Sequence, residues 1–142
     1  MELEFRPDLI PGVPEALKEL HGKYRLGVIS DAIFTPGKAL RRILSDYGLL
    51  GMFEVFVFSD EAGRSKPDPL VFRTAAEAFG VKPAEMIHVG DREQNDVDGP
   101  HRFGARALLC TAAVDRGSAD TKAEAVFGDY RELPGNIEKL SQ

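Results

Sequence analysis

Short apolar runs alternate with amphipathic segments along the chain, and this alternation is the strongest constraint on its fold. The runs predict strands at residues 24–30, 55–58, 86–89, 107–110 and 125–127. Between most of them, apolar residues recur at a spacing of three or four, the pattern of a helix with one buried face. This alternation predicts an α/β fold: a Rossmann-like, three-layer arrangement with a mostly parallel sheet, helices on both faces and right-handed crossovers.

Helix boundaries are marked by proline, glycine and one acidic residue. The pattern predicts helices at residues 14–21, 36–47 and 69–79, a short helix that ends near residue 104, and a final helix at 130–140. Asp68 is expected to cap the helix that Pro69 begins, and Gly80 is expected to end it. The polar segment 59–67 is longer than a simple connection requires, which predicts a binding loop.

Length and net charge limit the classes of protein to which this chain can belong. A chain of 142 residues is expected to form one domain, residues 1–142. Its 18 Lys and Arg against 23 Asp and Glu give a net charge of -5, which argues against general binding of nucleic acid or membranes. Cys110 is the single cysteine and excludes an internal disulfide, and residues 1–5 lack the features of a secretion signal. We therefore expect a cytoplasmic protein.

A dense cluster of acids follows the predicted strand at 86–89. Gly90 permits a sharp turn, after which Asp91 lies at the carboxyl end of the strand and Asp96 near the start of the next helix. Carboxylates held close together repel each other, and an oxygen-preferring divalent cation such as Mg²⁺ relieves that repulsion. An alternative role for Asp96 and Asp98 is to cap that helix.

Three separate segments bring polar side chains to the same edge of the predicted sheet. Ser30 ends one strand, Lys66 lies in the loop after the next, and Asp91 and Asp96 follow a third. A hydroxyl donor, an ammonium and metal-binding acids are the parts that phosphoryl transfer requires, because its catalysis is largely positioning and electrostatic stabilisation. Each residue also has an ordinary role as a strand end, a solvated lysine or a turn residue. Their combination, in this order, favours the phosphoryl-transfer site.

These motifs resemble the haloacid dehalogenase (HAD) superfamily of hydrolases, chiefly its phosphatase branch with a helical cap inserted after the first strand. Residues 26–31 are similar to the family's second motif, 66–69 to its third, 88–96 to its fourth, and 11–14 to the return from the cap. The resemblance covers nearly the whole chain. It implies a HAD-like core and a hydrolase that acts on a small phosphorylated metabolite with Mg²⁺ as cofactor.

The resemblance also implies a role for each site residue. Ser30 would contact the phosphoryl group of the substrate, with Asp31 beside it, and Lys66 would bind the phosphate and steady the nucleophile. Ser30 and Lys66 are therefore the expected catalytic residues. Asp91 and Asp96 are the expected metal residues, with Asp91 holding Mg²⁺ and Asp96 supporting the site.

The family's first motif, Asp-x-Asp on the first strand, supplies the nucleophile and the general acid, and no Asp-x-Asp lies on a predicted strand of these 142 residues. The chain begins where the family's cap would end, so the first strand and the cap are expected to be absent as well, leaving a partial core. We therefore expect this chain alone not to hydrolyse phosphate esters. Arg92, Pro100 and His101 are smaller departures from the family pattern.

The alternative function is that of a non-catalytic protein of the same fold, which binds Mg²⁺ or phosphate or serves as an interaction module. Receiver domains also place acids, a hydroxyl and a lysine around Mg²⁺, but their acids come first and their lysine last. Here Ser30 precedes Lys66 and the acids come at the end. Dehalogenation needs no Mg²⁺, so the acidic fourth motif argues against it.

By resemblance, the absent strand would lie between the strand that ends at Ser30 and the strand that ends at Val89. Unpaired main-chain groups on two interior strands are costly. We therefore expect the two strands to pair directly, to borrow a strand from a partner chain, or to be completed in a homodimer. Residues 1–5 are a poor filler, because their alternating glutamates suit a half-exposed edge and a central parallel strand is apolar on both faces.

Overall fold

The computed structural model describes residues 12–30, 37–112, 115 and 118–141. Its helices are α1 (Val13–His21), α2 (Gly37–Asp46), α3 (Ser59–Ala62), α4 (Pro69–Phe79), α5 (Gly99–Phe103) and α6 (Leu133–Leu140). Its strands are β1 (Leu26–Ser30), β2 (Phe53–Phe58), β3 (Ile87–Gly90), β4 (Arg106–Cys110) and β5 (Ala125–Phe127). Shorter helical turns are η1 (Leu50–Met52), η2 (Pro83–Glu85), η3 (Glu93–Asp98), η4 (Ser118–Asp120) and η5 (Tyr130–Glu132).

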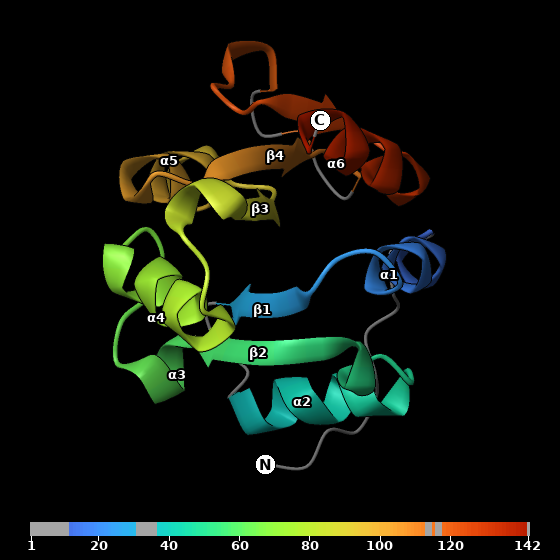
Figure 1. The fold of residues 1–142 in the computed structure, drawn as a ribbon, viewed down its shortest axis with the longest axis vertical. Coiled ribbons are helices and arrows are strands. Elements are labelled where there is room, and N and C mark those ends of the chain that lie inside the picture. The colour runs from blue at the N-terminus through green and yellow to red at the C-terminus, as the bar shows by residue number, and fades with distance from the viewer. Residues whose placement is uncertain (1–11, 31–36, 113–114, 116–117, 142) are drawn as a thin grey trace.

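All pairing between the described strands is parallel, as the alternation of strands and helices predicts, but the strands form two sheets. β1 pairs with β2, and β3, β4 and β5 pair in that order (Figure 1). Within the part of the chain that the structure describes, β1 and β3 do not pair with each other. Direct pairing of these two strands, one of the three expected outcomes, is therefore not what the structure adopts. Residues 1–5 lie outside the described residues.

The structure confirms the predicted start and end of α4. The side chain of Asp68 accepts a hydrogen bond of 2.9 Å from the backbone N–H of Leu70, and Pro69 occupies the first turn. Gly80 ends α4 in the left-handed conformation, with φ of 71°, which glycine adopts without a Cβ clash. These signals lie within four residues of the helix ends, which is why the sequence predicts them well.

The segment after β2 differs from the predicted loop. Residues 59–62 form α3, a single helical turn that continues directly from the strand. Asp60 of this turn accepts two hydrogen bonds of 3.1 Å from the backbone N–H of Gly37, one at each carboxylate oxygen. Arg41 reinforces the same junction through two hydrogen bonds to Glu61. The first half of segment 59–67 therefore anchors α2, and the remainder carries Lys66 toward the strand ends.

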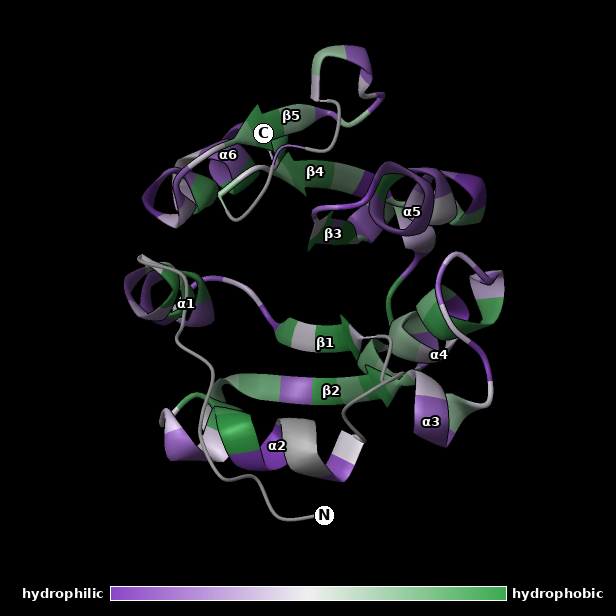
Figure 2. Ribbon diagram, turned by 180° about the vertical axis from the view of Figure 1, so that it is seen from behind, coloured by the Kyte–Doolittle hydropathy of each residue, from purple (hydrophilic) through white to green (hydrophobic). Residues whose placement is uncertain are grey.

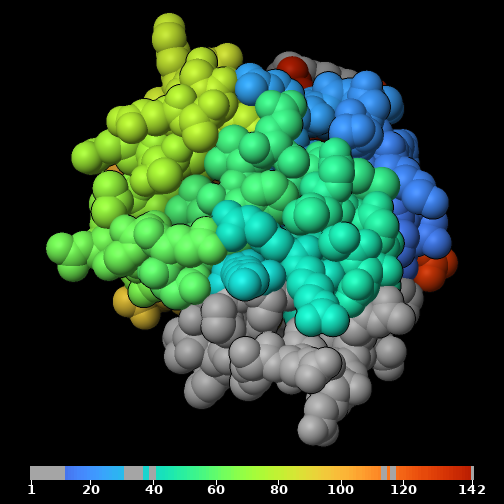
Figure 3. Space-filling view, turned by 90° about the horizontal axis from the view of Figure 1, so that it is seen from below, coloured from blue at the N-terminus to red at the C-terminus, as the bar shows by residue number. Residues whose placement is uncertain are grey.

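Helices cover both sides of the strands. On one side, buried residues of α1, β4, β5 and α6 form one core cluster, and on the other α4 packs against β2 to form a second. Figure 2 shows that the strands are mostly hydrophobic, whereas polar residues concentrate on the helices and turns. Seen from below, α2 and the segment that follows it form part of the molecular surface (Figure 3). Among the described residues, no helix combines the length and the apolar character that crossing a membrane requires.

The strands that face each other across the break are only half-buried. The apolar residues at 86–89 suit a buried parallel strand, yet every residue of β3 keeps intermediate exposure, and so do four of the five residues of β1. By contrast, four of the five residues of β4, which has a strand on each side, are buried. A cavity of about 750 Å³ lies between β1 and β3 and accounts for the exposure of their apolar side chains.

Candidate functional site

Asp96 is the centre of the polar cluster at the carboxyl end of β3. Its Oδ1 accepts hydrogen bonds from Lys66 Nζ at 2.6 Å and from His88 Nε2 at 2.9 Å. Its Oδ2 accepts from the backbone N–H groups of Asp91 and Arg92, both at 3.1 Å. With a side-chain exposure of only 4%, Asp96 is the single buried charged residue in the described ranges. Four donors therefore replace the water that this carboxylate would otherwise bind.

The local backbone is shaped to place this carboxylate under the strand end. Residues 93–98 form a turn of π-helix, a form that is frequent at functional sites. Gly90 is required here, because a Cβ at that position would overlap the carboxylate of Asp96. The glycine that the sequence marks as a sharp turn is therefore also needed for close approach. Asp96 was expected near the start of a helix, and it lies in this π-helical turn just before α5.

The pKa of Asp96 reflects two opposed effects. Burial raises the pKa of the carboxyl, but the hydrogen bond from His88 and the charge and hydrogen bond of Lys66 lower it more. The net result is a pKa well below the usual range of an aspartate, so the group is ionised at every physiological pH. Because Asp96 is anionic, it holds the Lys66 ammonium in a defined position at the strand ends.

His88 and Tyr130 belong to this region and were missed by the sequence reasoning. His88 lies in β3, with its ring edge-on to Phe72 at a centroid distance of 5.3 Å and its Nε2 on Asp96. Burial raises the pKa of Tyr130 above its usual value, and Cys110 and the charges of Asp91 and Asp96 raise it further. Tyr130 is therefore a neutral phenol close to the acids. The sequence signal for His88 was a polar histidine inside an otherwise apolar strand. Tyr130 comes from a distant segment, and its neighbours in the sequence gave no such signal.

The other predicted site residues differ in where the structure places them. Ser30 ends β1 opposite Phe58 of β2, so it lies at the carboxyl end of its strand as predicted. Asp31 lies outside the described residues. Asp91 directly follows β3 and is half-buried, and Lys66 is 12% exposed. The structure thus unites Lys66, Asp91 and Asp96 in one cluster, and places Ser30 on the neighbouring sheet.

The cluster fits a hydrated cation better than a closed metal cage. Both oxygens of Asp96 are occupied by donors, one of them the Lys66 ammonium, which leaves this carboxylate poorly suited to bind a metal directly. In the described ranges, no three His, Cys, Asp or Glu side chains are grouped to hold a metal. Mg²⁺ is commonly bound through one or two carboxylates, several waters and the phosphate of a substrate. Asp91 suits such a site.

The departures from the family pattern have local explanations. Pro100 is fully buried in the first turn of α5, where its missing N–H costs no helical hydrogen bond. His101 pairs with Glu124 at 2.7 Å, and Glu124 also accepts from the backbone N–H of Ala107. Arg92 is exposed and contributes its backbone N–H to Asp96. These residues therefore stabilise the site's surroundings without entering the cluster.

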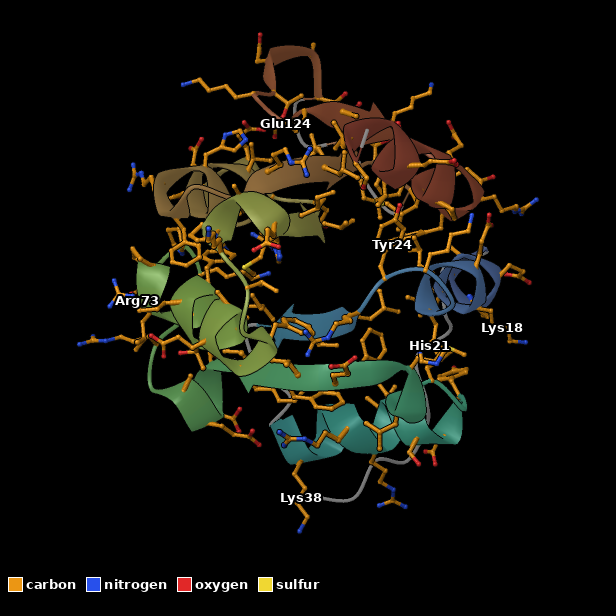
Figure 4. The ribbon with its side chains drawn as sticks, viewed as in Figure 1. Lys18, His21, Tyr24, Lys38, Arg73 and Glu124 are labelled. Carbon is orange, nitrogen blue, oxygen red and sulfur yellow. The ribbon has the colours of Figure 1, made fainter. Side chains whose placement is uncertain are left out.

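The basic residues labelled in Figure 4 lie on different sides of the molecule. Lys18, Lys38 and Arg73 lie on α1, α2 and α4 and point away from the strands (Figure 4). These three residues therefore lie on separate parts of the surface, and Lys66 is held within the cluster by Asp96.

The buried cluster makes a prediction about stability and pH. Asp96→Asn should lower the free energy of unfolding at pH 7 by roughly 3 kcal/mol, because Lys66 loses its buried counter-ion. Since the folded-state pKa of Asp96 is depressed, its contribution is present above the ordinary aspartate value of 3.8 and is lost as the pH falls below that value. Urea unfolding at pH 7 and pH 3 should therefore show a smaller difference between wild type and variant at pH 3. Asp98→Asn, whose side chain makes no capping bond, is the control; an equal loss in both variants would contradict the prediction.

Comparison with known proteins bears on the identity of this site. A family model for haloacid dehalogenase-like hydrolases matches residues 2–104. The phosphoserine phosphatase of Thermus thermophilus is 40% identical over 129 residues, which cover 87% of this chain and 50% of that protein. The glyceraldehyde 3-phosphate phosphatase of Methanopyrus kandleri is 35% identical over 113 residues, which cover 78% of this chain and 43% of that protein. The chain thus spans about half the length of these curated relatives.

Solved structures agree with the sequence relatives. The crystal structure of a HAD phosphatase from Thermococcus onnurineus has a TM-score of 0.78 to this fold and 30% sequence identity, and the match covers 89% of this chain and 57% of that one. The parallel strands, the polar cluster at the end of β3 and the matched family model lead to one conclusion. This chain belongs to the haloacid dehalogenase-like hydrolases.

Proposed function

We propose that this chain provides the phosphate- and cation-binding part of a Mg²⁺-dependent phosphatase site for a small phosphorylated metabolite. The observation that carries the proposal is the Lys66–Asp96–His88 cluster next to Asp91, in a chain whose curated relatives include phosphatases. The named substrates of those relatives, phosphoserine and glyceraldehyde 3-phosphate, are both small phosphate monoesters. They support the substrate class and leave the individual substrate open.

Each residue has a definite part in this proposal. Lys66 would offset the negative charge of the phosphate, held in place by the buried carboxylate of Asp96. Ser30, at the end of β1, would donate its hydroxyl hydrogen to a phosphoryl oxygen. Asp91 would hold Mg²⁺ with water and the phosphate, and the cation would supply charge neutralisation and polarisation at phosphorus. His88 would keep Asp96 in position.

The nucleophile is the part that these residues do not supply. Phosphatases that work through an aspartyl phosphate need a carboxylate in line with the phosphorus and an acid at the leaving oxygen. Asp60 is one of the two nearest candidate substitutes for the nucleophile, and both of its oxygens accept hydrogen bonds from Gly37 N–H, which supports a structural role. Asp31 is the other and lies outside the described residues. We therefore propose that the chain alone is catalytically incomplete.

Metal binding should depend on Asp91. Isothermal titration with MgCl₂ should show weak binding that is reduced by about tenfold or more in Asp91→Ala, because the proposed carboxylate ligand is removed. Asp98→Ala is the matched control, since Asp98 is similarly half-buried in the same acidic segment. Equal losses in the two variants, or no binding by the wild type, would remove the basis for the metal assignment.

Catalysis by the chain alone should be absent. The purified protein, with Mg²⁺, should release p-nitrophenol from its phosphate at a rate no higher than that of an Asp91→Asn variant prepared identically, because the proposed site residues include no in-line nucleophile. Asp31→Asn and Asp60→Asn variants complete the set. Robust turnover that is lost in Asp91→Asn and in one of these two would refute the prediction and identify the nucleophile. Turnover unchanged in all variants would indicate a contaminating enzyme.

A further inference from the structure

We propose that Glu93 is a positioning residue for the cation and phosphate site: it ties the turn that carries Asp96 to residues 121–122 and so keeps the carboxylate of Asp96 under the end of β3. The catalytic meaning of this inference rests on the proposed function, whereas the contacts themselves do not depend on it. Glu93 belongs to the acidic segment after β3, and none of the roles proposed above uses it.

Both carboxylate oxygens of Glu93 accept hydrogen bonds from the segment before β5. The hydroxyl of Thr121 donates to Oε1, and the backbone N–H of Lys122 donates to Oε2 at 2.9 Å. Thr121 is itself fixed, because its Oγ1 accepts a hydrogen bond of 3.1 Å from the backbone N–H of Ala123. Hydrogen bonds to a carboxylate are generally stronger than those to a neutral acceptor. With both oxygens occupied, Glu93 is suited to hold the chain and poorly suited to bind a cation directly.

The π-helical turn η3 is thus tied to two separate parts of the chain. Asp96 bonds to Lys66 and to groups in and just after β3, whereas Glu93, at the start of the same turn, bonds to Thr121 and Lys122. A helical turn of six residues is not stable alone, so contacts outside the turn hold its shape. Glu93 supplies such a contact at the end of the turn where the chain arrives from β3.

The segment that Glu93 contacts is a firm support. Its residue Ala123 packs against a cluster of three buried residues, Val97, Ala107 and Leu109. Glu124, beside β4 (Figure 4), accepts hydrogen bonds from His101 of α5 at 2.7 Å and from the backbone N–H of Ala107 at 2.8 Å. β5 begins at the next residue. Residues 121–124 are therefore held by β4 and α5, and Glu93 fixes the turn against them.

The position of the turn sets the geometry of the strand end. Oδ2 of Asp96 accepts hydrogen bonds from the backbone N–H groups of Asp91 and Arg92, and Glu93 follows these two residues directly. Without the contact to Thr121, the turn gains freedom to move away from β3, and both hydrogen bonds are weakened. Asp91 is the proposed cation ligand, and groups that orient a ligand without touching the metal affect how tightly the metal binds. Glu93 therefore acts on the site through the backbone of Asp91.

Amide hydrogen exchange of the full chain, without Mg²⁺ or phosphate, tests the inference. Glu93→Ala should accelerate exchange of the Asp91 and Arg92 amides by about tenfold or more, because their hydrogen bonds to Asp96 open more often. The amides of Leu108 and Leu109, buried in β4, should keep their rates. Unchanged rates at Asp91 and Arg92 would overturn the proposal. Equal acceleration at all four amides would also overturn it, because that result indicates a general loss of stability.

Two further variants separate the hydrogen bonds of Glu93 from other effects. Glu93→Gln keeps an oxygen for the N–H of Lys122 and gains an amide that donates to Thr121 Oγ1, so exchange should stay within about threefold of wild type. Gln94→Ala is the matched control, since Gln94 is the next residue of the same turn and is exposed, and it should leave the rates unchanged. Acceleration by either variant as large as that of Glu93→Ala would overturn the proposal.

Thr121→Val tests whether Glu93 acts through its partner. Valine is similar in shape to threonine but lacks the hydroxyl, so it should accelerate exchange at Asp91 less than Glu93→Ala does, because the N–H of Lys122 still reaches Glu93. The double variant should exchange at about the rate of Glu93→Ala alone, because residues in direct contact are not additive. Fully additive effects would overturn the proposal, since they would show that the two residues act independently.

Titration with MgCl₂ separates this inference from the proposed function. Glu93→Ala should weaken Mg²⁺ binding by about tenfold, and Glu93→Gln should restore most of the affinity. Wild-type affinity in Glu93→Ala would overturn the positioning role. Absence of Mg²⁺ binding by the wild type would instead refute the proposed metal site, and the exchange rates at Asp91 and Arg92 would still decide whether Glu93 fixes the turn.

Discussion

The ion pair between Lys66 and Asp96 connects parts of the molecule that no strand pairing joins in the described residues. Lys66 follows β2 and α3 in one sheet, and Asp96 follows β3 in the other, and their atoms are 2.6 Å apart with little solvent access. His88 and two backbone N–H groups complete the acceptor sites of Asp96. A buried carboxylate is stable only when it is bonded in this way, so the cluster fixes the relative position of the two strand ends.

The same arrangement explains why the polar cluster around Asp96 is complete although a cavity remains in the hydrophobic core between β1 and β3. The polar cluster and the packing of α4 hold the strand ends together on one side, while β1 and β3 stay apart and leave a cavity between them. Apolar residues that would be buried in a continuous sheet remain half-exposed there. The polar cluster is thus more complete than the hydrophobic core beneath it, which agrees with a chain that spans about half of its curated relatives.

Local signals in the sequence predicted most elements, and long-range contacts account for what they missed. The cap at Asp68, the stop at Gly80 and the strand at 125–127 depend on a few neighbouring residues, and the structure has them as predicted. The role of Asp60 depends on Gly37, and the role of His88 depends on the π-helical turn that brings Asp96 beneath β3. The half-buried state of β3 was mispredicted, because burial depends on a neighbouring strand that periodicity does not report.

β1 and β3 each have one edge that no strand in the described residues pairs with, and residue-resolved amide hydrogen exchange measures this directly. We expect β4, which has partners on both sides, to be strongly protected, while some amides in β1 and some in β3 exchange at rates close to those of unstructured peptides. Protection of every β1 and β3 amide to the level of β4 would contradict it, because it would show that the two edges are paired in solution.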